Sequence, residues 1–394
     1  MKRILFVYHA SNIGGGTYCL LNILKEIDRA KYQPIVLLRT EGDLVKEIKA
    51  LGIDVFYMPT MTLVPYNKSM WNWRVLRAYR RIEKSFAVFG ILLDKISPDA
   101  VYLNTMMLAP YLEVAKSKGY KTAIHLREHW PLNEHRKQLA RLQIIIGSYA
   151  DQVVAINGYS ASMVPTKKAT IVYDWIDLSQ RYEYRPFDDI FNEDASKLKV
   201  YLFTGGLQDI KGAAEVVDVF RKRIKEKEKR LLMVGVDPHP NYVGLKNKVR
   251  QLLSKIGFNV YEYKVRKMIA TDDRIVCIPA TYAMTHIMEQ SYCNLSFFTI
   301  PHANLALAES IIVGTVPVAA KTDESIEYSY GGELALLFEL GNKDDLSEKL
   351  KELDRNYDEI KAKIVKEGHF VQEQFDKARN VAVLDGVFTK LFEN

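Results

Sequence analysis

Four short segments of this chain combine glycines, histidines and charged residues in patterns that suit the binding of an anion or a polar ligand. The first, SNIGGGT at residues 11–17, places Gly14, Gly15 and Gly16 just before a helical pattern. Glycine lets the backbone approach a ligand closely, and the unpaired N–H groups at a helix start can bind an anion. The match to a dinucleotide-binding fingerprint is poor, because Cys19 stands where the third glycine should be. The segment is therefore either a ligand-facing loop or a simple tight turn.

The second segment, HLREH at residues 125–129, follows an apolar run and holds three kinds of ionisable side chain. At the end of a strand, His125 can hydrogen-bond a sugar hydroxyl or a phosphate, and Arg127 can hold an anion with two parallel hydrogen bonds. Either histidine of the segment could instead be a core residue with satisfied hydrogen bonds. The clustering at the carboxyl end of one strand favours a functional role.

The third segment, GGLQDIKG at residues 205–212, is a glycine-rich turn after an apolar run, with Lys211 where the next helix begins. Lysine is a point cation that suits a diphosphate. Solvated lysines at helix starts are equally common, so the segment alone does not decide between the two interpretations.

The fourth segment, FFTIPHANLALAES at residues 297–310, joins a buried strand to a helix whose N-terminus can bind phosphate. Glu309 lies further along this helix, among apolar residues such as Leu305 and Ile312. A carboxylate in such surroundings needs a polar partner, and the two hydroxyls of a ribose would supply one. The alternative is an exposed glutamate on the polar side of an ordinary helix.

The elements that hold these segments alternate along the whole chain, with apolar runs of strand length followed by segments of helix length. This alternation is typical of a parallel sheet covered by helices. In the first half we expect strands at 3–8, 34–39, 54–57, 100–103, 121–126, 152–156 and 169–173 and helices at 17–28, 43–50, 71–95, 106–118 and 134–147. In the second half we expect strands at 199–205, 230–235, 274–278, 294–300, 316–320 and 334–339 and helices at 211–228, 242–256, 283–292, 303–313, 344–353, 356–378 and 379–394.

The pattern predicts an α/β protein with two Rossmann-like, doubly wound domains facing each other across a cleft. Residues 178–196 lose periodicity and turn acidic, as a linker would, so we place the boundary there. The expected domains are 1–177 and 178–378, with a final helix at 379–394 that crosses back to the first domain. Because ligands bind beyond the carboxyl ends of parallel strands, we expect the site between the two halves.

These segments, in this order across two Rossmann-like halves, resemble those of the GT-B glycosyltransferases, and specifically family 4, the retaining group that uses nucleotide sugars. The family's glycine loop, its central histidine segment and its phosphate-binding Lys-Gly look like segments one, two and three. Its Glu-x7-Glu element, followed by a Gly-x-Pro-Val strand entry, looks like the segment that ends in Glu309 and Gly314-Thr315-Val316-Pro317-Val318. The resemblance covers nearly the whole chain.

The resemblance implies transfer of a sugar from a nucleoside diphosphate donor to a saccharide or lipid-linked acceptor, without a cofactor or metal ion. Expected catalytic residues are His125 beside the transferred sugar, Lys211 at the leaving diphosphate and Glu309 at the ribose. Expected donor-binding residues are Gly205, Gly206, Lys211, His302, Ala303, Asn304, Leu305 and Glu309. Expected acceptor-binding residues are Gly14, Gly15, Gly16, Arg127 and Glu128.

The sequence departs from the family pattern at the sugar end of the site. Pro301 stands where the family has its first glutamate, and His302 is the neighbour that could take over the sugar contact. Gly206 stands where many members carry an arginine, and Asp174 and Trp175 replace the Asn-Gly of the crossover between the halves. These departures keep two alternatives open: a weakened binding or scaffold subunit of a polysaccharide-assembly complex, and a sugar-nucleotide epimerase.

Composition excludes other classes. Hydrophobic residues make up 48% of the 394 residues and charged residues 26%, which is not the composition of a disordered chain. The 3 cysteines are far apart, so neither a disulfide framework nor a zinc motif is expected. The net charge of +7 favours anionic partners. No nucleic-acid motif appears, and a nicotinamide dehydrogenase is disfavoured by the failed fingerprint.

A helix expected around 71–86 carries a basic stripe, which comprises Arg74, Arg77, Arg81 and Lys84, with Trp71 and Trp73 beside it. Its opposite face is apolar. The few, scattered cysteines favour a reducing cytosol, and the basic stripe predicts that this helix attaches the protein to an anionic membrane surface at the inner face. An ordinary solvated face is the alternative.

Overall fold

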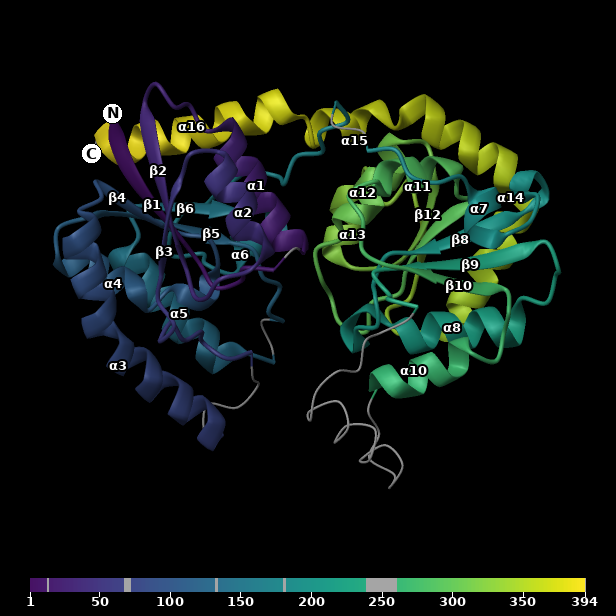
Figure 1. Ribbon diagram of the computed structural model, residues 1–394, viewed down its shortest axis with the longest axis horizontal. Helices are drawn as coiled ribbons and strands as arrows, with labels where there is room; N and C mark the ends of the chain where they lie inside the picture. The colour runs from purple at the N-terminus through teal and green to yellow at the C-terminus, as the bar shows by residue number, and fades with distance from the viewer. Residues whose placement is uncertain (13, 67–71, 132–133, 180–181, 239–260, 394) are drawn as a thin grey trace. The chain divides into compact units, whose positions relative to one another are not determined.

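The computed structural model describes residues 1–12, 14–66, 72–131, 134–179, 182–238 and 261–393. These residues form two compact units, each built on its own parallel sheet (Figure 1). Unit 1 comprises Met1–Trp175 and Phe375–Asn394, and unit 2 comprises Ile176–Gln374. The predicted α/β class with two doubly wound halves is confirmed. The helix predicted at 242–256 lies outside the described residues.

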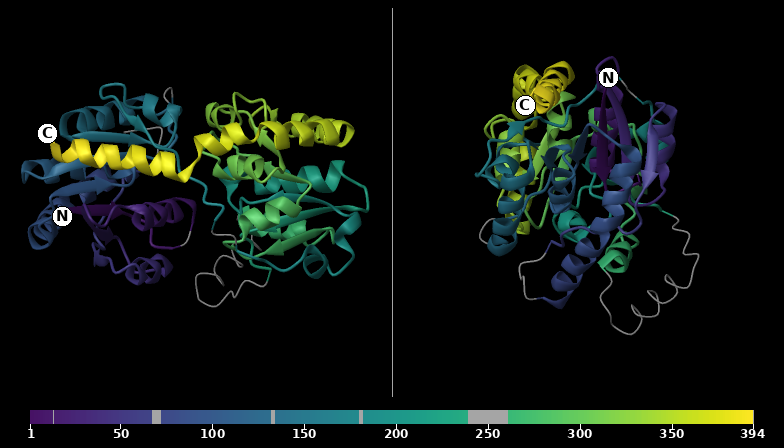
Figure 2. Two further views of the ribbon diagram at one scale, coloured as in Figure 1. Left: turned by 90° about the horizontal axis from the view of Figure 1, so that it is seen from above. Right: turned by 90° about the vertical axis from the view of Figure 1, so that its left-hand side faces the viewer.

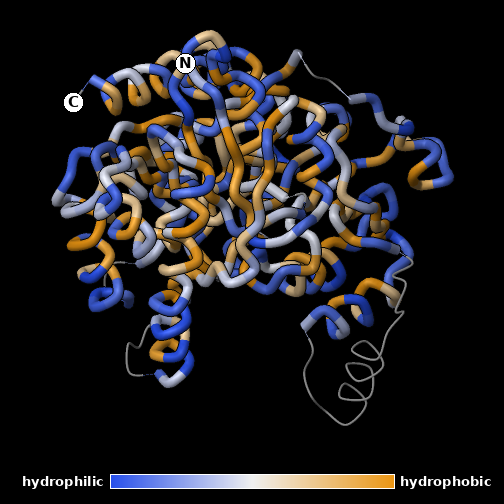
Figure 3. Tube along the Cα trace, turned by 60° about the vertical axis from the view of Figure 1, so that its left-hand side comes forward, coloured by the Kyte–Doolittle hydropathy of each residue, from blue (hydrophilic) through white to orange (hydrophobic). Residues whose placement is uncertain are grey.

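The sheet of unit 1 has the strand order β3-β2-β1-β4-β5-β6-β7, and every neighbouring pair is parallel. Its strands are β1 (Lys2–Tyr8), β2 (Tyr32–Leu38), β3 (Asp54–Tyr57), β4 (Ala100–Leu103), β5 (Lys121–Leu126), β6 (Gln152–Ala155) and β7 (Thr170–Ile171). Both faces of this sheet are covered, so the central strands are nearly continuous apolar runs. The trace coloured by hydropathy shows these runs in orange (Figure 3).

Helices cover the two faces of this sheet in separate groups. On one face α1 (Gly15–Glu26), α2 (Asp43–Ala50) and α16 (Lys377–Glu393) share a core with the side chains of Ile4 and Phe6. On the other face, α3 (Trp73–Ile96), α4 (Tyr111–Ser117) and α5 (Arg136–Tyr149) share a core with those of Leu5 and Val7. Successive residues of a strand point to opposite faces, which explains this division. A short helix, α6 (Gly158–Ser162), follows β6.

The C-terminal helix α16 belongs to unit 1 and lies along it in all the views (Figures 1 and 2). Its Phe388 ring contacts the rings of Phe6, Tyr32 and Tyr102, at centroid distances of 6.1, 5.5 and 5.7 Å. The side-chain amide oxygen of Asn380 accepts a hydrogen bond of 2.9 Å from the backbone N–H of Tyr173, two residues after β7. The end of the chain thus completes the core around its first strand.

The sheet of unit 2 has the strand order β10-β9-β8-β11-β12-β13, again with all pairs parallel. Its strands are β8 (Lys199–Phe203), β9 (Lys229–Val234), β10 (Ile275–Ile278), β11 (Cys293–Ser296), β12 (Val316–Ala320) and β13 (Leu336–Phe338). Its helices are α7 (Phe187–Phe191), α8 (Ala213–Arg223), α10 (Tyr261–Ile269), α11 (Met284–Gln290), α12 (Leu305–Ile312), α13 (Asp323–Tyr328), α14 (Lys343–Glu367) and α15 (His369–Gln374). No helix within the described residues is long and apolar enough to cross a membrane.

Several element boundaries differ from the sequence prediction. The strand predicted at 294–300 ends at Ser296, because Phe298 adopts a left-handed backbone with φ of 41° and turns the chain. The helix predicted at 106–118 is a 3-10 turn followed by α4, and the break falls at Pro110, whose ring cannot continue a helix. The predicted linker 178–196 contains α7, which buries Phe187 and Ile190 in the core of unit 2. The break predicted between 353 and 356 is present as a kink in α14 at Asn356, whose backbone is not helical, but the helix predicted at 356–378 ends at Glu367 and α15 follows it.

Candidate functional site

Both sheets reverse their strand order at one place, and the predicted ligand-binding segments follow the strands there or beside it. In unit 1 the reversal lies between β1 and β4, and in unit 2 between β8 and β11. At such a point the connections leave to opposite faces of the sheet, so the carboxyl ends of the two strands border an open crevice. In unit 1 the glycine loop follows β1, and the histidine segment comprises the last two residues of β5 and the three residues after them. In unit 2 the Lys-Gly loop follows β8 and the fourth segment follows β11.

The glycine loop of unit 1 leaves free space at two of its three glycines. A Cβ atom added at Gly15 would meet no atom within 4 Å, and one at Gly14 would meet only a threonine hydroxyl at 3.9 Å. At Gly16 it would lie 2.4 Å from the hydroxyl of Tyr8, so a larger residue there would displace that hydroxyl. The N–H of Gly14 donates to the Thr17 hydroxyl at 2.7 Å, which anchors the start of α1. The loop therefore presents backbone to open space.

His125 is buried, with 1% of its surface exposed, and lies on the same sheet face as Tyr102. Its Nδ1 lies 2.8 Å from the Tyr102 hydroxyl and 3.2 Å from Nη1 of Arg127. Its Nε2 is buried and has no hydrogen-bond partner among the described residues. Burial and the charge of Arg127 both hold the pKa of His125 well below its usual value, so the ring is neutral.

Arg127 donates two hydrogen bonds from Nη2 to the carboxylate of Asp174, at 2.5 and 2.6 Å. The Arg127 side chain is only 7% exposed. Burial disfavours its charge, but Asp174 outweighs that effect and raises the pKa of Arg127 above its usual value. The sequence reasoning gave Arg127 an anion-binding role, and in the structure that anion is a carboxylate of the chain itself. This ion pair gives a structural reason for an aspartate at position 174, where the resembled family has asparagine.

Glu128 has both carboxylate oxygens occupied. One accepts from the Thr105 hydroxyl, and the other accepts from the backbone N–H groups of Met106 and Arg127, at 2.9 and 3.1 Å. Burial raises the pKa of Glu128, and these hydrogen bonds oppose the shift. The carboxylate thus caps the turn after β4. The acceptor-binding role predicted for Arg127 and Glu128 stays a prediction, and in this structure both side chains serve internal contacts.

Asn104 is a residue that the sequence reasoning missed. It follows the last residue of β4, and its N–H continues the ladder with β1 by donating to the Val7 carbonyl at 3.0 Å. The β4–β5 register ends at Leu103 and Ile124, and the next residues of the two strands are Asn104 and His125. Its side chain is fully buried, and neither the amide oxygen nor the amide nitrogen has a partner among the described residues. An unpaired buried amide at a switch point is suited to hydrogen-bond a polar ligand. The two polar residues that follow the strand 100–103, Asn104 and Thr105, were the available signal.

In unit 2 the Lys-Gly loop is held tightly against the loop that follows β11. Gly212 has φ of +72°, and a Cβ there would lie 2.4 Å from the ring of Phe297. A Cβ at Gly205 would lie 2.3 Å from the ring of Phe203, and Gly206 has φ of +59°. The N–H of Thr299 donates to a carbonyl of the Lys-Gly loop at 3.0 Å. The glycines of this segment are therefore required by the fold itself.

Lys211 lies between these loops, half-buried, with its ammonium 4.4 Å from the ring centroid of Phe298. The ammonium makes no hydrogen bond or ion pair with any described residue. Burial lowers the pKa of the Lys211 ammonium to about 8. A partly buried cation with no anion beside it among the described residues is suited to bind an anion from solution.

The fourth segment turns sharply after β11 and then starts α12. The ring of His302 lies 5.6 Å from that of Phe298, whose backbone is left-handed. Asn304 precedes the first residue of α12, Leu305. Its Oδ1 accepts from the Ser296 hydroxyl at 3.4 Å, and its Nδ2 has no partner among the described residues. The predicted residues from His302 to Leu305, including Ala303, thus line the approach to the helix N-terminus, where unpaired backbone N–H groups are available.

Glu309 lies on α12, and its side chain is only partly exposed to solvent. Its carboxylate makes no hydrogen bond or ion pair with a described residue, and burial raises the pKa of Glu309 to about 7. The sequence predicts a carboxylate among apolar neighbours that needs a polar partner, and no described residue supplies one. Its proposed ligand, the ribose, stays a prediction.

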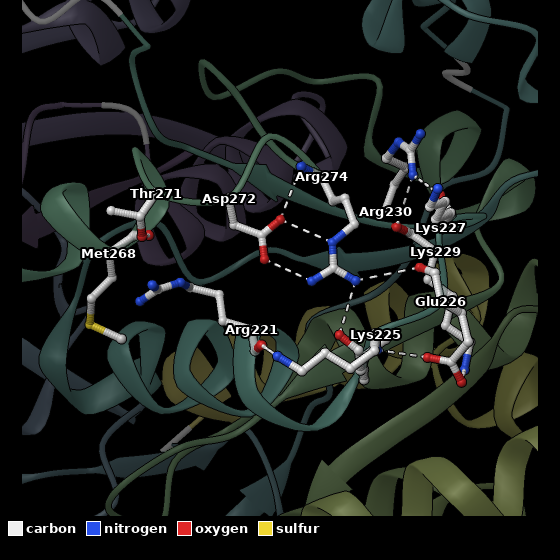
Figure 4. A network of polar contacts seen from close by, with 11 residues as sticks. Arg221, Lys225, Glu226, Lys227, Lys229, Arg230, Met268, Thr271, Asp272 and Arg274 are labelled. Carbon is white, nitrogen blue, oxygen red and sulfur yellow. Dashed lines mark hydrogen bonds and ion pairs between the residues drawn. The ribbon is translucent and has the colours of Figure 1, made fainter.

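A different kind of charged cluster lies at the amino-terminal ends of β9 and β10 in unit 2 (Figure 4). The Lys-Gly loop and the fourth segment, in contrast, follow the carboxyl ends of strands. Arg274 there donates to both oxygens of Asp272, at 3.0 and 2.7 Å, and to the Ile224 carbonyl at 2.9 Å. Arg274 and Asp272 are thus paired with each other, in contrast to Lys211 and Glu309. Within the described ranges, no three His, Cys, Asp or Glu side chains are grouped so that they could hold a metal ion.

No family model and no curated protein matches the sequence, whereas solved structures match the fold. HepE (Alr3699) of Anabaena, in complex with UDP and glucose, is 16% identical with a TM-score of 0.75, covering 99% of this chain and 100% of that one. Sucrose-phosphate synthase of Thermosynechococcus elongatus is 12% identical with a TM-score of 0.72, covering 100% of both chains. A glycosyltransferase of Rickettsia africae is 16% identical with a TM-score of 0.71, covering 100% of this chain and 99% of that one. This likeness confirms the predicted GT-B fold.

Proposed function

We propose that this protein is a glycosyltransferase that moves a sugar from a nucleoside diphosphate donor to a hydroxyl of a saccharide or lipid-linked acceptor. One observation carries the proposal. Lys211 and Glu309, an ammonium and a carboxyl, lie in the segments that follow β8 and β11, and both are partly buried without a side-chain partner among the described residues. Such groups destabilise an empty protein and are typical of a binding site.

A nucleoside diphosphate supplies what each group lacks. Its phosphates would neutralise Lys211 and accept hydrogen bonds from the first turn of α12, since N–H groups and the helix dipole both favour an anion there. Its ribose hydroxyls would donate to the carboxylate of Glu309. HepE was solved with UDP-glucose, so uridine nucleotides are the first donors to test.

The chemistry required of the protein is to stabilise the negative charge that builds on the departing diphosphate and to hold the acceptor near the anomeric carbon. Lys211 and the N-terminus of α12 supply the first, without a metal ion. The backbone of Gly14 and Gly15 borders open space and would shape the acceptor side. His125 would lie near the transferred sugar, and retention of the anomeric configuration is part of the proposal.

Calorimetric titration of the full chain with UDP and with uridine tests the donor site. We expect Lys211→Met to weaken UDP binding at least about tenfold while changing uridine binding little, because only the diphosphate carries the charge that the ammonium attracts. Lys197→Met is the matched control, since Lys197 is an exposed lysine of the same unit. Equal losses for UDP and uridine, or no binding of any nucleoside diphosphate, would refute the assignment.

A binding or scaffold subunit is the second candidate, favoured by Pro301 at the position of the family's first glutamate. Such a protein would bind the nucleotide sugar and form no glycoside with any acceptor. An epimerase would convert the donor in the absence of acceptor. Product analysis with and without a pool of acceptors separates these two from a transferase.

We also propose that α3 attaches the protein to an anionic membrane surface at the cytoplasmic face. The predicted division of this helix is observed: Val75 and Ile82 are buried in the core of unit 1, while the four residues of the basic stripe are exposed. Trp71 lies outside the described residues. On the exposed side, Trp73 and Leu76 are 62% and 44% exposed. Basic and apolar groups on one face suit the interface of an anionic bilayer.

Vesicle co-sedimentation tests this attachment, with vesicles of phosphatidylcholine alone or mixed with phosphatidylglycerol. The variant replaces four residues by glutamine: Arg74, Arg77, Arg81 and Lys84. Each basic residue near such a surface contributes about 1 kcal/mol, so we expect the variant to lose salt-sensitive binding to the anionic vesicles without loss of thermal stability. Equal binding of wild type and variant would identify an ordinary solvated face.

A further inference from the structure

The side chains around His125 form a chain of contacts that begins at Asp174. Asp174 binds Nη2 of Arg127 with both carboxylate oxygens, and Nη1 of the same guanidinium lies 3.2 Å from Nδ1 of His125. The Tyr102 hydroxyl lies 2.8 Å from the same Nδ1. Tyr102 is fully buried, with its ring 5.7 Å from that of Phe388, so it has little freedom to move away.

This geometry determines which nitrogen of the imidazole carries the proton. A guanidinium has only N–H donors and accepts no hydrogen bond, so Nδ1 must be the acceptor beside Arg127. The Tyr102 hydroxyl can donate to the same lone-pair region. In a neutral ring with an unprotonated Nδ1, the proton is on Nε2. Burial and the charge of Arg127 keep the ring neutral.

The consequence is a buried N–H donor without an acceptor. Nε2 of His125 has no partner among the described residues, and the amide of Asn104, the residue that follows β4, has none either. Leaving a buried donor unpaired is unfavourable, so the site is suited to an oxygen that arrives with a ligand. A protonated Nε2 on a ring that resists a second proton cannot take a proton from an acceptor hydroxyl.

We propose that Asp174, acting through Arg127 and together with Tyr102, is a positioning residue that fixes His125 as the neutral Nε2–H tautomer, so that it donates a hydrogen bond to an oxygen of the transferred sugar. The sugar contact rests on the proposed function, whereas the tautomer does not. Asparagine at position 174 would offer a single neutral oxygen to Arg127. The aspartate offers two charged ones, which hold the guanidinium in the orientation that His125 requires.

Nitrogen NMR of the full chain labelled with 15N-histidine tests the tautomer directly, and His125→Gln identifies the signals by their loss. We expect the wild type to show a protonated Nε2 and an unprotonated Nδ1. Asp174→Asn combined with Tyr102→Phe should bring in the Nδ1–H form, with the single variants between. Asp272→Asn is the matched control, because it breaks a similar bidentate pair with Arg274 in unit 2 (Figure 4). A wild-type proton on Nδ1 would overturn the inference even if no variant folds.

Kinetics separates this inference from the proposed function. With an active donor and acceptor, we expect Asp174→Asn to lower kcat roughly tenfold to a hundredfold while KM for the donor stays within about threefold, and Asp272→Asn to change neither. A KM effect alone, or an equal loss in both variants, would contradict a positioning role for Asp174. If the wild type shows the Nε2–H tautomer but transfers no sugar, the proposed function fails and the assignment of the tautomer stands.

Discussion

Replacing Glu309 by glutamine should make the empty protein more stable at alkaline pH and its nucleotide binding weaker. The carboxyl has no partner among the described residues, and burial raises its pKa from 4.5 to about 7. A raised carboxyl pKa means that the folded state binds the proton more tightly than the unfolded state. Ionisation of Glu309 therefore opposes folding, and glutamine removes this effect while keeping the size of the side chain.

The magnitude follows from the shift in pKa. A shift from 4.5 to about 7, at about 1.4 kcal/mol per unit, corresponds to roughly 3 kcal/mol when the group is fully ionised. Because part of the side chain is accessible to water, we expect about 1–3 kcal/mol. The penalty is absent below about pH 4.5, grows between about 4.5 and 7 as the unfolded chain alone ionises, and is complete above about pH 7.

Thermal unfolding of wild type and Glu309→Gln at about pH 5 and about pH 8 measures the effect. For a unit of about 200 residues, each kcal/mol corresponds to roughly 2–4 °C in Tm, so the variant should melt several degrees higher at the alkaline pH and less so at the acidic one. Glu359→Gln is the matched control, since Glu359 is an exposed glutamate on α14 of the same unit. It should change Tm little at either pH.

The same variant should lose nucleotide affinity, because a neutral amide is a weaker acceptor for ribose hydroxyls than a carboxylate. The expected loss is about 1.5–3 kcal/mol, or roughly tenfold or more in Kd for UDP at pH 8. A variant that gains stability at pH 8 yet binds UDP as tightly as the wild type would show a buried carboxyl without a ligand-binding role. A variant with no pH-dependent gain in stability would refute the reasoning from burial itself.

Three further predictions concern His125, the glycines of the two loops, and Asn104. His125→Ala should lower turnover while leaving Kd for UDP within about threefold, measured by product formation and titration, and failure to fold would favour a core role for the histidine. Gly212→Ala should destabilise unit 2 by at least about 1 kcal/mol, because φ is +72° and the added methyl meets the ring of Phe297, whereas Gly15→Ala should leave Tm unchanged but weaken activity if the loop faces an acceptor. Asn104→Leu should leave the protein folded, as the amide loses no hydrogen bond to a described residue, and reduce turnover.

Much of the fold could be predicted from the sequence, because strands in a parallel sheet are buried on both faces and appear as apolar runs. The strands at Asp54–Tyr57, Ala100–Leu103 and Lys121–Leu126 were predicted to the residue. The predicted boundaries were wrong where a single backbone angle ends a strand, as at Phe298, or where a single proline interrupts a helix, as at Pro110. Such angles depend on neighbours that the local pattern does not contain.

The four candidate segments were also visible in the sequence, because the chemistry of glycine turns and helix starts is local. Whether the charged side chains of these segments are paired or unpaired is decided by tertiary contacts. Only the folded chain brings Asp174 to Arg127, and only there does Lys211 lie over a phenylalanine ring without an anion beside it. Ion pairs, unpaired buried groups and shifted pKa values depend on distance and desolvation, and these are set by residues far apart in the chain. The sequence alone therefore determines which groups are available at the ends of the strands, and the tertiary structure determines which of them remain free for a ligand.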